Sequence, residues 1–124
     1  MSRNRLDGTL PPALGALSRL KVLYTYSNRL TGPIPDALAQ CTALEDIQVS
    51  KNGHSGHVPD LSALTRLKTL WLDENALTGN IGESALSRLT SLETLHAEEN
   101  DFVVSTQTAE ALRLSLPRLR NFRV

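Results

Sequence analysis

Two histidines in one short stretch are the first residues whose spacing could support chemistry. His54 and His57 stand three positions apart in HSGH, within a chain of 124 residues. A metal site would need further cysteine or carboxylate ligands at suitable spacing, and only Asp60 lies close by. Because His54 occupies a position that is otherwise leucine, we interpret it as a tolerated substitution and expect no bound metal.

The residues present do not favour nucleophilic or acid–base catalysis either. Cys41 also occupies a leucine position, where a buried free thiol behaves as a small hydrophobe. His96 and Glu98 are two positions apart, on one face of the expected strand, and would suit proton transfer, but no nucleophile or pocket accompanies them. The glycines belong to a repeat rather than to a phosphate-binding loop. We therefore expect no enzyme and no cofactor.

An internal repeat determines which elements position these side chains. Five asparagines recur at intervals of 23 to 25 residues, and glycine follows the first four of them four positions later. The segments before the last four asparagines align as LKVLYTYSN, LEDIQVSKN, LKTLWLDEN and LETLHAEEN, and the final LRNFRV fits the same template. The asparagines are Asn4, Asn28, Asn52, Asn75 and Asn100.

These segments resemble the leucine-rich repeat family, specifically its plant-type subclass with the pattern L-x-x-L-x-L-x-x-N-x-L-x-G-x-I-P. The stretch NRLTGPIPDALAQCTALEDI carries the resemblance most clearly, and it extends from Asn4 to Val124, although the last coil lacks the glycine and the proline. The resemblance implies an α/β fold: a right-handed solenoid with a parallel concave sheet of about five strands. Its convex side would carry turns, 3₁₀ turns and short helices.

We interpret residues 1–124 as a single domain of about five repeats. Neither end has a capping coil, although solenoids need polar caps to stay soluble. We therefore expect either a fragment of a larger receptor or scaffold, or a chain whose ends are covered by partners.

Physical reasoning about the repeat gives the same architecture. Each LxLxx piece alternates apolar and polar residues, the period of a half-buried strand, and only stacking against a neighbouring coil buries its apolar side. The turn after each strand needs its backbone groups paired, so we expect the stacked asparagine amides to bridge adjacent coils. Thr25 fills an inward position and needs a partner for its hydroxyl. The inward set is Leu20, Leu23, Leu44, Ile47, Leu67, Leu70, Leu72, Leu92 and Leu95.

Two segments predict helices on the outer face. Residues 83–89 (ESALSRL) and 108–116 (TAEALRLSL) are rich in helix-favouring residues, and Pro117 would end the second helix.

The outward strand positions hold the candidate binding residues. Counted four residues before each asparagine, one column contains Tyr24, Gln48, Trp71 and His96, and Arg123 extends it. Counted two residues before, another contains Tyr26, Ser50, Asp73 and Glu98. Exposed aromatic side chains supply contact area at low entropic cost, which favours partner binding. The alternative interpretation is that they merely shield the sheet from water. The candidate partner-binding residues are Tyr24, Tyr26, Gln48, Trp71, Asp73, His96 and Glu98.

Charge and composition narrow the partners. The 13 basic and 13 acidic residues balance, and the acidic positions near Asp73, Glu74, Glu98 and Glu99 would repel nucleic acid but suit a basic segment of a protein. No apolar run is long enough to insert into a bilayer. No signal peptide, sequon or pair of cysteines is visible, while the resembled family is often extracellular or membrane-anchored, so the compartment stays open.

Two functions remain on this reading. The first is a protein-interaction module, receptor- or scaffold-like, that binds a protein or peptide on the concave sheet. The alternative is a structural or assembly segment that contacts partners through its open ends, including end-to-end or homo-oligomeric contacts.

Overall fold

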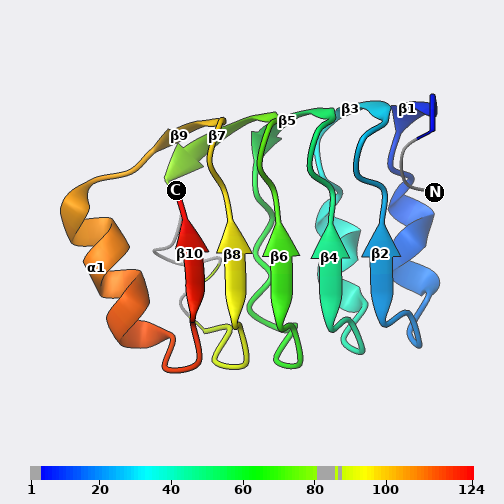
Figure 1. Cartoon of the computed structure of the whole chain (residues 1–124). Helices are drawn as coiled ribbons and strands as arrows, with labels where there is room; N and C mark the ends of the chain where they lie inside the picture. The colour runs from blue at the N-terminus through cyan, green and yellow to red at the C-terminus, as the bar shows by residue number, and fades with distance from the viewer. Residues whose placement is uncertain (1–3, 81–85, 87) are drawn as a thin grey trace.

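Two parallel five-stranded sheets form the walls of the molecule in a computed structural model that describes residues 4–80, 86 and 88–124 (Figure 1). The concave sheet has the order β10-β8-β6-β4-β2, and the second sheet has the order β1-β3-β5-β7-β9. Each coil contributes one strand to each sheet. The solenoid with its concave sheet is the one that the repeat predicts, and the second sheet is additional to it. The strands of the concave sheet are β2 (Val22–Tyr24), β4 (Asp46–Gln48), β6 (Thr69–Trp71), β8 (Thr94–His96) and β10 (Asn121–Arg123). Those of the second sheet are β1 (Asp7–Thr9), β3 (Arg29–Gly32), β5 (Gly53–His57), β7 (Ala76–Asn80) and β9 (Asp101–Val103).

Among the described residues, helical segments return the chain to the concave sheet in three coils. The first two are 3₁₀ helices, η1 (Pro12–Ala16) and η2 (Asp36–Gln40), and each directly follows a proline. The predicted helix at 108–116 is confirmed as α1 (Thr106–Ser115), which begins two residues earlier because Ser105 caps it. The Ser105 side chain accepts a hydrogen bond from the Thr108 backbone N–H at 3.1 Å. The other predicted helix, 83–89, lies largely outside the described residues.

The core lies between the two sheets and consists mainly of stacked leucines. Eight of the nine predicted inward residues are buried, and Leu20, in the first coil, is only partly buried. Leu23, Ile47, Leu70 and Leu95 are in register across neighbouring strands, so each covers the side chain of the next coil. Burying each such side chain contributes roughly 1.5–3 kcal/mol.

The asparagine ladder is confirmed. The Asn75 Oδ1 accepts a hydrogen bond from the His54 backbone N–H of the preceding coil at 3.1 Å. Its Nδ2 donates to the Val49 carbonyl of that coil at 3.1 Å and to the Leu72 carbonyl of its own coil at 3.0 Å. Asn52 and Asn100 repeat this arrangement. Asn28 likewise accepts from the preceding coil and donates to the Thr25 carbonyl of its own coil. The ladder therefore pairs the backbone groups that the turn would otherwise leave buried and unsatisfied.

The glycine that follows each of the first four asparagines by four positions adopts a left-handed backbone. Gly79 has φ +97°, a conformation that costs L side chains energy, and a Cβ there would come within 2.5 Å of the His57 Nδ1. Backbone geometry thus explains the glycine column, and close packing adds to it at Gly79.

Candidate functional site

The predicted column of outward residues runs straight across the concave sheet. Tyr24 pairs with Gln48, Gln48 with Trp71, Trp71 with His96, and His96 with Arg123 in the parallel register. Counting back from the asparagines therefore gave the correct register. Five side chains of different chemistry consequently stand on neighbouring strands about 4.8 Å apart.

Trp71 and His96 form the centre of this column. Their rings are stacked, with centroids 5.1 Å apart and planes at 12°. His96 is 9% exposed, so the structure buries a residue that the repeat places on the outward side. The indole covers it, which sequence spacing alone does not reveal. Trp71 Nε1 and His96 Nε2 are buried and have no hydrogen-bond partner among the described residues.

Three side chains on β2 and β4, the first two strands of the concave sheet along the chain, form a hydrogen-bonded group. The Tyr24 hydroxyl donates to Asp46 Oδ2 at 2.6 Å, and Gln48 Nε2 donates to Asp46 Oδ1 at 3.2 Å. The hydrogen bond to Asp46 is the largest of the causes that raise the pKa of Tyr24 above 10.0. The Tyr26 ring lies 6.3 Å from that of Tyr24 at 59°. Sequence reasoning missed Asp46, although its place six residues before an asparagine is a signal that could have found it.

Two of the acidic residues have polar partners. Asp73 accepts a hydrogen bond from the Ser50 hydroxyl of the neighbouring coil. One oxygen of Glu98 lies 3.9 Å from an Arg123 nitrogen, while its Oε2 is buried and unpartnered among the described residues. Asp73 and Trp71 belong to the same coil, so the aromatic and acidic parts of the face overlap there rather than occupying opposite ends of the sheet.

The histidines and the cysteine highlighted by the sequence are not brought together. His54 lies in the core at 0% exposure, with its Nδ1 3.2 Å from the Gly32 carbonyl. Burial lowers its pKa below the ordinary 6.5, and the hydrogen bond to Gly32 opposes this only in part. His57 is exposed, whereas Cys41 is buried with its Sγ 3.1 Å from the Leu14 carbonyl. Within the described ranges, no group of three or more His, Cys, Asp or Glu side chains could hold a metal ion.

Known proteins with repeats of this kind are similar to this chain. The family model for the leucine-rich repeat matches residues 19–41. The ectodomain of the receptor kinase SOBIR1 from Arabidopsis thaliana is 34% identical over 93% of this chain, with a TM-score of 0.81. This chain is a plant-type leucine-rich repeat protein.

Other solved structures are similar to it over shorter ranges. The Arabidopsis receptor kinase HAESA, solved with the peptide hormone IDA and the co-receptor SERK1, is 31% identical over 82% of this chain, with a TM-score of 0.79. A plant ice-binding protein is 35% identical over 78%, with a TM-score of 0.72. This leucine-rich repeat chain spans 60% of the SOBIR1 chain, 17% of the HAESA chain and 32% of the ice-binding chain. No curated protein matches it.

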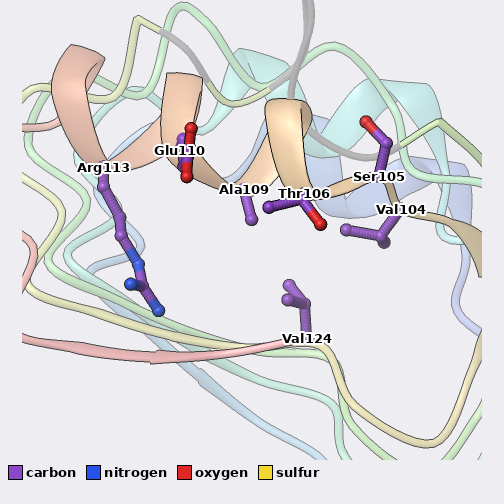
Figure 2. A pocket seen from close by; sticks show the side chains of 7 residues that line it. All are labelled: Val104, Ser105, Thr106, Ala109, Glu110, Arg113 and Val124. Atoms are coloured by element: carbon purple, nitrogen blue, oxygen red, sulfur yellow. The ribbon is translucent and has the colours of Figure 1, made fainter.

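The last coil of the leucine-rich repeat also forms a pocket of about 400 Å³ between α1 and the C-terminal strand (Figure 2). Val104, Ala109 and Val124 contribute apolar side chains, while Glu110 and Arg113 contribute charges. The Arg113 guanidinium lies 5.3 Å from the centre of the Phe122 ring. In the part of the chain that the structure describes, no helix has the length and apolar character needed to cross a membrane.

Proposed function

We propose that this leucine-rich repeat segment binds a protein or peptide on its concave sheet and carries out no catalysis itself. The contact residues are Tyr24, Tyr26, Gln48, Trp71, Asp73, His96 and Glu98. The observation that carries the proposal is the stacked Trp71–His96 pair at the centre of a column that crosses five strands in register. Aromatic side chains held rigid before binding lose little entropy on contact, which makes them effective anchors.

The polar groups around this pair favour a peptide-like ligand. Trp71 Nε1 and Glu98 Oε2 have no partner among the described residues, so a small shift of either side chain would offer a donor and an acceptor to a ligand. Asp46, Asp73 and Glu98 make the face acidic, and a ligand with basic side chains would complement it. The complex of HAESA with the peptide hormone IDA supports peptides as a ligand class.

The test begins with peptides selected from a random display library on the wild-type protein. Their affinities are then measured for Tyr24→Ala and Trp71→Ala, with Thr31→Ala and Thr78→Ala on the second sheet as matched controls. Truncating a central aromatic anchor should cost 2 kcal/mol or more, about thirtyfold in Kd, while the controls should bind as the wild type does. If the concave-sheet variants and the controls lost the same affinity, or if neither set lost any, the concave sheet would be excluded as the peptide-binding surface.

The pocket beside α1 favours a second candidate, contact through the open end of the solenoid. In that case Val124→Asp would abolish partner binding, and Tyr24→Ala and Trp71→Ala would leave it intact.

A further inference from the structure

Positive charge is concentrated on one edge of a chain whose overall charge is zero. The five-residue segments that lead into the concave strands carry six cationic and two anionic side chains, and all six cations are exposed. None of the six belongs to the ion pairs of the described chain, Lys51–Glu74 and Arg123–Glu98. We name this set the basic edge; it consists of Arg19, Lys21, Arg66, Lys68, Arg118 and Arg120.

The basic edge has a regular spacing that comes from the backbone. Glu45 N donates to the Lys21 carbonyl, and Lys68 N donates to that of Glu45, both at 2.8 Å. Glu93 N donates to the Lys68 carbonyl, and Arg120 N donates to that of Glu93, again at 2.8 Å. These five residues therefore stack one per coil, at the strand spacing of about 4.8 Å.

The charge along this stack alternates from coil to coil. Coils one, three and five carry the motifs SRLK, TRLK and PRLR, each with two cations. Coils two and four instead place Glu45 and Glu93 at the stacked position, with Ala43 and Ser91 two residues earlier. Pairs of cations consequently recur every two coils, roughly 9.6 Å apart, with a carboxylate between them.

This spacing selects one conformation of an acidic peptide. A polyproline II helix has three residues per turn and rises about 3.1 Å per residue, so every third side chain lies on one face about 9.3 Å apart. A β-strand instead places every second side chain on one face, roughly 6.7 Å apart. An α-helix repeats its face every seven residues at about 10.5 Å and would drift out of phase along the edge.

We propose that the basic edge is a second interaction surface, separate from the concave sheet, that binds an extended acidic peptide in the polyproline II conformation with Asp or Glu at every third residue. The cation pairs attract the spaced carboxylates. Glu45 and Glu93 supply the repulsive element, because an evenly charged polyanion would place negative charge directly against them.

The test measures fluorescence anisotropy of a labelled peptide of repeated Glu-Pro-Pro units at low salt. Comparison ligands are a Gln-Pro-Pro repeat, a peptide of the same composition with its glutamates clustered, polyglutamate, a sulfated polysaccharide and single-stranded DNA. We expect the Glu-Pro-Pro repeat to bind most tightly. The Arg66→Glu/Lys68→Glu variant should weaken it about tenfold or more, because two exposed attractions become repulsions.

Two further variants keep the result interpretable. Arg5→Glu/Arg29→Glu makes the same change in charge at exposed positions outside the basic edge and should leave the affinity unchanged. Glu45→Lys/Glu93→Lys should let polyglutamate bind as tightly as the spaced peptide. The proposal would be overturned if the wild-type protein bound the clustered peptide, the polysaccharide or the DNA as tightly as the Glu-Pro-Pro repeat. It would also be overturned if the control variant weakened binding as much as Arg66→Glu/Lys68→Glu, or if the Glu-Pro-Pro repeat did not bind.

Discussion

Trp71 and His96 stack face to face across β6 and β8, with ring centroids 5.1 Å apart. The stack depends on the parallel register that pairs the two residues, and that register depends on the asparagine ladder one turn further along the chain. The geometry of the candidate site is therefore a direct consequence of how the coils are held together. Changes in the ladder and core should alter stability, whereas changes in the outward column should alter binding.

Replacing Asn75 by alanine should destabilise the protein. The substitution leaves the Val49 carbonyl and the His54 backbone N–H without their bonds to the side chain, at about 1–3 kcal/mol for each group left unsatisfied. Urea unfolding measures the loss. Asn80→Ala, at an exposed position of β7, is the matched control. Equal stability of the two variants would mean that the ladder does not hold the coils.

Replacing Thr25 by valine should stabilise the protein. Thr25 is fully buried, and its Oγ1 has no hydrogen-bond partner among the described residues, contrary to the expectation that the hydroxyl would find one. Valine has nearly the same shape and occupies the equivalent position of the next coil as Val49. Thermal unfolding should show a gain of about 1–3 kcal/mol. A loss of stability would indicate that the hydroxyl is satisfied in solution, for example by water.

Replacing His54 by leucine should remove part of the acid sensitivity of the fold. Because burial lowers the pKa of His54 in the folded state, the unfolded state binds more protons once the pH falls below about 6.5. The free energy of unfolding is therefore highest above that pH, where His54 is neutral in both states, and it decreases as the pH falls towards the folded-state pKa. Urea unfolding between about pH 7 and pH 5 should give a shallower decline for His54→Leu than for the wild type. His57→Gln is the control, and an equal decline in His54→Leu and wild type would refute the assignment.

Replacing Asp46 by asparagine should lower the pKa of Tyr24 towards its ordinary value near 10. The Asp46 carboxylate accepts a hydrogen bond from the Tyr24 hydroxyl, with the two oxygens 2.6 Å apart, and thereby favours the protonated phenol. Ultraviolet titration of the tyrosines measures the change, with Tyr26→Phe used to assign the signal. An unchanged titration curve would show that the hydrogen bond does not form in solution.

The sequence was sufficient to predict the coils, the register and the end of α1, since each depends on a local pattern. The asparagine spacing located the ladder, and Pro117 marked where the helix would stop. The burial of His96 could not be predicted, because it depends on the size of the indole on the neighbouring strand. The bond between Tyr24 and Asp46 was missed because it runs diagonally from the Tyr24 column to the column six residues before each asparagine, which holds no candidate binding residue.

The second sheet was harder to predict than the first. The segment Gly53–His57 has two glycines, two histidines and a serine, so it lacks the apolar alternation by which a strand is recognised. It forms β5 because its neighbours on both sides pair with it. The basic edge was overlooked because balanced totals of acidic and basic residues conceal how charge is distributed along the solenoid.

The fluorescence of Trp71 tests the proposed binding face most directly, because it is the single tryptophan of the chain and lies at the centre of that face. A peptide selected on the wild-type protein is titrated while its binding is followed independently by anisotropy. We predict a saturable change in Trp71 emission with the same Kd as the anisotropy curve. Saturable anisotropy with unchanged emission would contradict a ligand site on the concave sheet.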